Sequence, residues 1–178
     1  MLDLVAPTAR LRDSWLGSRE EWAGGYQDGT GLHPTDDVDT VEGFAAWVTR
    51  LHREGDESVP PAPGRVHATY WWIVDSDEYL GAITLRHSLN DFLLNAGGHI
   101  GYSVRPSARG RGLATWALGE VLVRAARRLD RVLITCSDTN VASARTIERC
   151  GGVLEDVRDT ELGRTRRYWI DLRPLQGS

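Results

Sequence analysis

Residues 104–115 form the segment of this chain best suited to chemistry, because glycines and arginines alternate there in Val-Arg-Pro-Ser-Ala-Arg-Gly-Arg-Gly-Leu-Ala-Thr. An apolar run over 99–104 predicts a strand before it, and an amphipathic run over 113–129 predicts a helix after it. The first N–H groups of a helix lack intrahelical partners and carry partial positive charge. A strand, a glycine turn and a helix start therefore predict a phosphate or pyrophosphate site. Its candidate residues are Arg109, Gly110, Arg111, Gly112, Leu113, Ala114 and Thr115.

Other interpretations of this segment remain open. Taken alone, the four residues Arg-Gly-Arg-Gly are also typical of a tight turn with two solvated arginines. Two nucleotide-binding loops fit less well. A Walker A loop needs Lys and then Ser or Thr after its last glycine, and Leu113 follows Gly112 here. A Rossmann fingerprint needs a third glycine where Thr115 stands.

A second motif follows a compact run of β-branched and apolar residues over 132–136, which predicts a strand. Asn140 is followed by Ser143 at plus three and by Gly151 at plus eleven. Asp138 or Asn140 could cap the start of a helix, and Gly151 is typical of a helix end. The cap alone would account for Asn140, and it is compatible with a binding role.

The two segments resemble motifs A and B of the GNAT-type N-acetyltransferase superfamily. Motif A has the pattern Gln/Arg-x-x-Gly-x-Gly/Ala, which residues 107–112 follow with Ser107 in the first place. Motif B pairs Asn with Ala or Ser at plus three and Gly at plus eleven, as in Asn140, Ser143 and Gly151. The resemblance covers residues 68–172, and before that point only the order of elements is similar.

The resemblance implies acetyl-coenzyme A as co-substrate. In the family, N–H groups of the glycine loop hold the pyrophosphate, and the equivalents of Asn140 and Ser143 lie near the pantetheine arm. Loss of the first motif A side chain, at Ser107, should weaken this binding. The backbone N–H of Val104 or of a neighbour would polarise the thioester carbonyl as a fixed dipole.

Acetyl transfer to an amine needs a base, because a protonated amine cannot attack. We expect His99 in this role, since an imidazole titrates near neutral pH. Tyr168 is a second catalytic candidate, on a closing strand that lines the acceptor pocket in family members. A surface His and a packed strand Tyr are the plain alternatives. Many family enzymes carry a Tyr acid seven residues after the motif B Asn, where this chain has Ile147.

Acceptor-binding residues are expected in the aspartate-rich loop over 28–39. Asp36 and Asp37 would attract a cationic amine, and Tyr102 is a further acceptor-side candidate. The alternative is a solvated loop whose aspartates cap the next helix. Small amines, antibiotics, amino acids and protein N-termini all remain open as acceptors.

The hydrophobic pattern predicts helices over 9–22 and 40–53 and strands over 2–6, 68–74, 79–86, 153–158 and 166–172, besides the elements above. A strand–helix–strand unit needs a crossover, so part of the sheet is parallel, and the hairpins make the rest antiparallel. The fold class is therefore mixed α/β. The resemblance implies that the central strands over 100–104 and 132–135 splay apart, with helices on both sides.

The length of 178 residues suits one domain, with residues 1–67 supplying the N-terminal helices and the acceptor-side loop and 68–178 the acetyl-coenzyme A core. A net charge of −4 disfavours nucleic-acid partners. Cys136 and Cys150 suggest no disulfide framework, and no Cys–His spacing suggests a metal. No membrane-length run or leader pattern is seen, so we expect a cytoplasmic protein without a membrane partner.

The function predicted from these residues is direct acetyl transfer from acetyl-coenzyme A to a primary amine of a small molecule or peptide. The alternative is a non-catalytic acyl-coenzyme A-binding or sensing module, which Ile147 in the acid position would suit. Family members are often dimers, so a homodimer is compatible with either.

Overall fold

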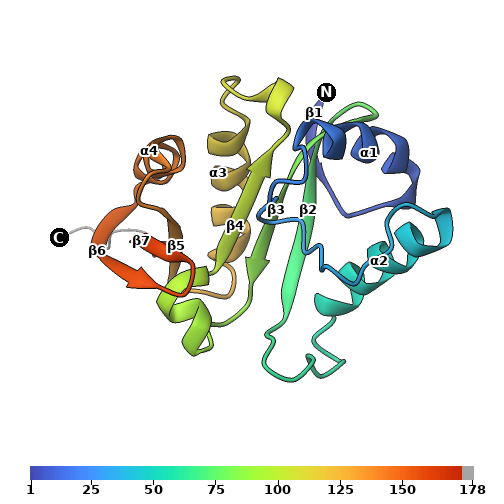
Figure 1. The fold of residues 1–178 in the computed structure, drawn as a ribbon. Helices are drawn as coiled ribbons and strands as arrows, with labels where there is room; N and C mark the ends of the chain where they lie inside the picture. Colours follow the sequence, from blue (N-terminus) through green and yellow to red (C-terminus); the bar gives the residue numbers. More distant parts are fainter. Residues whose placement is uncertain (174–178) are drawn as a thin grey trace.

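The computed structural model describes residues 1–173, which form one seven-stranded sheet with helices on both faces (Figure 1). The strands lie in the order β1-β2-β3-β4-β5-β7-β6. Their bounds are β1 Leu2–Val5, β2 Ala68–Asp75, β3 Glu78–Arg86, β4 Ile100–Val104, β5 Arg131–Ser137, β6 Val153–Thr160 and β7 Gly163–Asp171. The helices are α1 Arg12–Glu21, α2 Val41–Glu54, α3 Leu113–Ala125 and α4 Val141–Arg149, with short helical turns at Ala9–Leu11, Leu93–Gly97 and Pro106–Ala108.

The predicted elements are all present in these residues, and the largest difference lies at the end of α3. The amphipathic pattern predicts a helix to residue 129, whereas α3 ends at Ala125. The N–H groups of Arg127 and Arg128 bond to carbonyls three residues back, which tightens the chain into a turn. Leu129 still packs against the core from this turn, which explains why its hydrophobic spacing continues the helical pattern.

Alternating residues of the strands pack into two separate hydrophobic cores, one on each face of the sheet. Trp72 and Val74 face α1 and α2, where they join a cluster of aromatic rings around Trp15, Phe44 and Trp47. Neighbouring strand residues such as Ile73 and Ile83 face α3 and α4 on the other side of the sheet. The strands at the centre of the sheet are thus covered on both faces.

The two central strands, β4 and β5, are the parallel pair of the sheet, and they pair at a single position, Ile100 with Ile134. Both strands pair along their lengths with their outer neighbours, β3 and β7. The strands therefore open toward their carboxyl ends, and we call this opening the wedge. The mixed α/β fold with splayed central strands is confirmed.

Candidate active site

The glycine loop at the start of α3 has the conformation that a phosphate site requires. Gly110 and Gly112 have φ values of +77° and +76°, which side chains disfavour, and the space where a Cβ would lie is open at both. The first intrahelical bond joins the N–H of Trp116 to the carbonyl of Gly112, at 3.0 Å. The N–H groups of Leu113 to Thr115 precede this bond, so they lack an acceptor within the helix. The residues predicted from motif A therefore fit an incoming pyrophosphate.

The side chains before these glycines anchor the loop to α1. The carboxylate of Glu21 accepts hydrogen bonds from the N–H and hydroxyl of Ser107, at 2.9 and 3.0 Å, and pairs with Arg105 at 2.6 Å. Arg109 lies with its guanidinium 4.7 Å from the ring of Trp22 and donates to the carbonyl of Val104. Ser107, which departs from the motif A pattern, thus has a structural partner of its own.

Backbone groups of β4 point into the wedge. The carbonyl of His99 and the N–H of Arg105 both bond to β3. Successive peptide groups alternate along a strand, so those of Tyr102 and Val104 point the other way, toward β5. Because β5 pairs with β4 at only one position, the N–H of Val104 points toward the wedge.

Two side chains meet across the opening of the wedge. The phenol of Tyr102 on β4 lies 2.9 Å from the hydroxyl of Ser143 on α4. Burial raises the pKa of Tyr102 well above its usual value, so the phenol keeps its proton. Asn140 caps α4, because its side-chain oxygen accepts the N–H of Ser143 at 3.1 Å. The cap holds Ser143 in place, and the sequence alone did not pair it with Tyr102.

His99 lies at the closed end of the wedge and is only 5% exposed. The backbone N–H of His99 donates to the backbone carbonyl of Leu133 at 2.7 Å. The ring Nδ1 of His99 accepts the backbone N–H of Leu133 at 2.8 Å. Burial, with a smaller contribution from Arg86, lowers the pKa of His99 to about 4. The ring is neutral at pH 7 and its lone pair is engaged, so the contacts favour a role in holding β4 to β5 over that of a general base.

Tyr168, the other catalytic candidate, is fully buried in β7. Its hydroxyl donates to Glu148 of α4 at 3.1 Å. Ile147 is also fully buried and packs among the residues between α3 and α4. These contacts correspond to the packed-aromatic interpretation of Tyr168.

The predicted acceptor residues Asp36 and Asp37, in the loop between α1 and α2, have partners in this loop and on α2. Asp36 pairs with Arg50 at 2.6 Å and accepts the N–H of His33 at 2.7 Å. Asp37 accepts the hydroxyl of Thr40, the residue that caps α2, at 2.8 Å. Both side chains thus stabilise the loop and the helix start, which is the structural alternative noted above.

Asp28, earlier in the same loop, is the carboxylate that lies against the central strand. A Cβ on Gly101 of β4 would lie 2.3 Å from its Oδ1. Gly29 packs equally closely, since its Cβ would lie 2.5 Å from the carbonyl of Gly101. Two glycines therefore let the loop touch β4 next to Tyr102. From the sequence alone, Asp28 resembles the other aspartates of the loop. The Asp28-Gly29 pair, together with Gly101 on the strand, is the sequence signal that could have distinguished Asp28 from them.

The surroundings of Asp28 form a small hollow of about 100 Å³, whose lining includes His33, Arg65 and Arg86. Desolvation raises the pKa of Asp28, while Arg86 and the N–H of Gly29 oppose this. Its side chain is still 43% exposed, so an incoming molecule can reach it. A carboxylate beside the wedge, with its pKa raised by partial desolvation, can bind an ammonium group and accept its proton.

Within residues 1–173 no group of three or more His, Cys, Asp or Glu side chains is arranged to hold a metal ion. None of the helices in this part of the chain has the length and apolar character needed to cross a membrane.

Comparison with solved structures places this fold among acetyltransferases. The microcin C7 self-immunity acetyltransferase MccE, in complex with acetyl-CoA and AMP, matches with a TM-score of 0.70 at 16% identity, over 96% of this chain and 92% of that one. The ribosomal-protein-S5-alanine acetyltransferase from Vibrio fischeri gives 0.69 at 18%, over 97% and 94%. A chimera of spermidine N-acetyltransferase SpeG from Vibrio cholerae and hSSAT gives 0.65 at 15%, over 96% and 95%.

No curated protein matches the sequence. The family model described as an acetyltransferase (GNAT) domain matches residues 12–153, which include the helices before the first motif as well as both motifs. The expected family is thereby confirmed, and with it an acyltransferase activity. The chain belongs to the GNAT acetyltransferase family.

Proposed function

We propose that this protein transfers the acetyl group of acetyl-coenzyme A to a primary amine by direct attack. The observation that carries the proposal is the arrangement around the wedge, where the glycine loop, the N–H of Val104 and the Tyr102–Ser143 pair converge from one side and Asp28 from the loop. Solved structures of similar fold are named for acetylating ribosomal proteins and spermidine, which supports an amine acceptor.

The N–H groups of Gly112 to Thr115 would hold the pyrophosphate, with Asn140 and Ser143 beside the pantetheine arm. The carbonyl oxygen of the acetyl group would accept the N–H of Val104, which stabilises the negative charge that develops as nitrogen attacks. Of the predicted cofactor-binding residues, this assignment uses Val104, Gly112 to Thr115, Asn140 and Ser143.

The proton transfers need a base and an acid, and we assign them to Asp28 and to the Tyr102–Ser143 pair. The amine nitrogen forms a bond to the acetyl carbon, and the carbon–sulfur bond breaks. The nitrogen attacks in its neutral form, after its ammonium proton has passed to water. One further proton leaves nitrogen for the carboxylate of Asp28, and the departing sulfur takes a proton from the hydroxyl pair. Proton exchange with water then returns Asp28 and the pair to their starting states. Asp28 replaces His99 as the proposed base, because the lone pair of His99 is engaged.

The test is thiol release from acetyl-coenzyme A against amines of several classes, compared for the wild type and Asp28→Asn. We expect release with at least one class and about a hundredfold lower kcat/KM in the variant, with unchanged affinity for acetyl-coenzyme A. Asp39→Asn is the matched control. Asp39 belongs to the same loop, and its exposed side chain pairs with Arg19 of α1. Binding of acetyl-coenzyme A without release in any class would favour the sensing module.

A further inference from the structure

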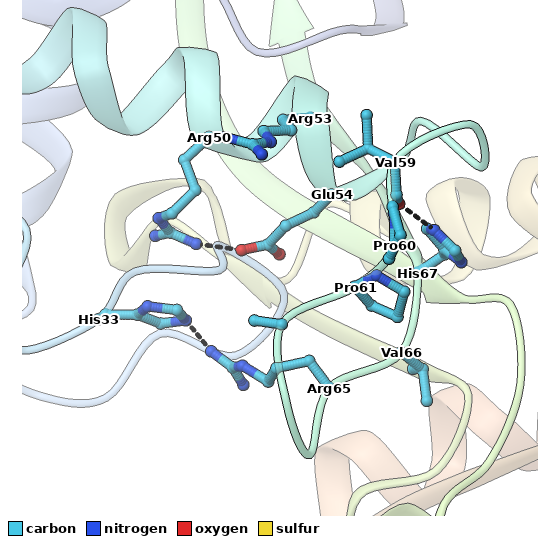
Figure 2. Close-up of a pocket in the computed structure, with 11 residues that line it drawn as sticks. His33, Arg50, Arg53, Glu54, Val59, Pro60, Pro61, Arg65, Val66 and His67 are labelled. Carbon is cyan, nitrogen blue, oxygen red and sulfur yellow. Dashed lines mark hydrogen bonds and ion pairs between the residues drawn. The ribbon is translucent and has the colours of Figure 1, made fainter.

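A second and larger hollow lies between the last turn of α2 and the connector formed by residues 55–67 (Figure 2). Its volume is about 460 Å³. Val59, Pro60 and Pro61 give it an apolar wall, and arginines from α2 and from the connector give it a cationic one. His33 and Arg65 line both this hollow and the smaller one at Asp28, so the two hollows adjoin at these side chains.

The carboxylates around the larger hollow are already engaged. Arg50 pairs with Asp36 at 2.6 Å and also with Glu54. The other oxygen of Glu54 accepts the hydroxyl of Tyr70 at 2.6 Å. These acids are therefore poor binding partners for an incoming cation, because it would have to displace contacts that are already made.

Arg53 and Arg65 differ from Arg50, since no carboxylate of residues 1–173 lies within ion-pair distance of either. Arg65 instead contacts Nε2 of His33. Desolvation and then the charges of Arg50 and Arg65 lower the pKa of His33, so its imidazole is neutral at pH 7 and can accept from Arg65. Arg65 is thus held where the two hollows meet, with its positive charge uncompensated.

We propose that the acceptor carries an anionic oxygen group, a carboxylate or a phosphate, which binds Arg65 and Arg53 while its amine lies at Asp28. The inference rests on the proposed function and names its substrate class. Opposite charges in two adjoining hollows orient such a molecule with its amine toward the wedge. Guanidinium groups suit both anions, because their paired N–H donors match two oxygens. The expectation of a plainly cationic acceptor is replaced by that of an amine with an anionic tail.

Matched acceptor pairs test the anion directly. The peptide Ala-Asp-Glu is compared with Ala-Asn-Gln, both with amidated C-termini, and phosphoethanolamine is compared with ethanolamine. We expect at least a tenfold higher kcat/KM for the anionic member of one pair, and the pair that responds identifies carboxylate or phosphate. The preference should fall as salt is raised from about 0.05 to 0.5 M, since screening weakens exposed charge pairs.

Arg65→Gln and Arg53→Gln test the residues. We expect Arg65→Gln to raise KM for the anionic acceptor about tenfold, with kcat and the KM of the neutral partner nearly unchanged. Arg127→Gln is the control, because it removes the same charge from an exposed position beyond α3. Equal preference for both members of each pair, or an effect of Arg65→Gln no larger than that of Arg127→Gln, would overturn the proposal.

A binding measurement separates this inference from the proposed function. Calorimetry measures the binding of the N-acetylated forms of the two peptides and of the two ethanolamines, with coenzyme A present. This measurement requires no turnover by the enzyme. Tighter binding of an anionic product, lost in Arg65→Gln, supports the anion site even if no acceptor releases thiol. Turnover of neutral amines without such a binding preference would uphold the transferase and refute the anion site.

Discussion

The phenol of Tyr102 and the hydroxyl of Ser143 lie 2.9 Å apart and join β4 to α4 across the opening between the central strands. One residue comes from the strand before the glycine loop and the other from the helix after β5, so 41 positions separate them in the chain. Only the crossover through α3 brings them together. A protonated phenol hydrogen-bonded to a second hydroxyl can pass a proton to a leaving thiolate, which the buried Ile147 cannot do.

Tyr102→Phe should lower kcat about tenfold to a hundredfold and leave the affinity for acetyl-coenzyme A within about twofold, because the ring still packs and only the donor is lost. Ser143→Ala should lower kcat to a similar extent, and the double variant should lower kcat no further than the poorer single variant. Tyr79→Phe is the control, since this buried Tyr lies in the α1–α2 core. Steady-state kinetics measures kcat, and calorimetry measures the affinity for acetyl-coenzyme A. Additive losses of kcat in the double variant would show that the two hydroxyls act separately.

Gly112→Ala should weaken acetyl-coenzyme A binding at least tenfold and lower the free energy of unfolding by about 1–2 kcal/mol, because φ at this position is +76°. Gly119→Ala, inside α3 and with open space at its Cβ, should instead raise stability by about 0.5–1 kcal/mol without changing affinity. Calorimetry and urea unfolding measure the two effects. Equal affinities for both variants would remove Gly112 from the phosphate site.

Asp36→Asn should lower the free energy of unfolding by about 1 kcal/mol, because the partly buried ion pair with Arg50 and the bond from the His33 N–H are both weakened. The KM for the acceptor should change little, in contrast to the role first predicted for Asp36. Asp91→Asn, on the exposed surface, is the reference for thermal unfolding and kinetics. A rise in KM with unchanged stability would restore Asp36 to the acceptor site.

His99 should make the protein less stable in acid. Its pKa is about 4 in the folded chain and about 6.5 in the unfolded chain, so the unfolded state binds more protons between these values. The stabilisation is complete above pH 6.5 and is lost as the pH falls to 4, by about 3 kcal/mol in all. His99→Asn can keep an acceptor for the Leu133 N–H but does not titrate, so its stability should fall less over this range.

Urea unfolding at pH 7 and pH 4.5 measures this difference, with His52→Asn as the control for an exposed His. Parallel losses in His99→Asn and the wild type would contradict the titration. The pH profile of kcat/KM in the same variant tests the original base assignment. Turnover that falls near pH 7 and recovers at high pH would return the base role to His99.

Local patterns were sufficient to predict most of the secondary structure. Trp71 and Trp72 are adjacent in β2 and pack into different cores, as the alternation of side chains along a strand requires. The end of α3 was wrong by four residues, because Leu129 packs on the core from a turn and mimics a helical position. Periodicity reports which residues are buried, and a turn can bury a side chain as well as a helix can.

Sequence patterns predicted one part of the candidate site and missed another. The loop proposed to hold phosphate could be predicted from sequence, because its chemistry would come from consecutive backbone groups and from glycines with positive φ. The acceptor-binding residues could not be predicted in this way, because the role of a carboxylate depends on the groups that surround it in the folded chain. Asp36 and Asp37 look as suitable as Asp28 in the chain, yet they lie beside Arg50 and Thr40, and Asp28 lies on Gly101.

The sequence by itself determined the family, the order of elements and the loop that suits a pyrophosphate, since each depends on residues adjacent in the chain. The tertiary structure decided which groups meet. It placed the lone pair of His99 on the Leu133 N–H, and it joined Tyr102 to Ser143 across the wedge. Such pairings depend on strand order and on the close approach of a loop to β4, and these follow from the packing of the whole sheet.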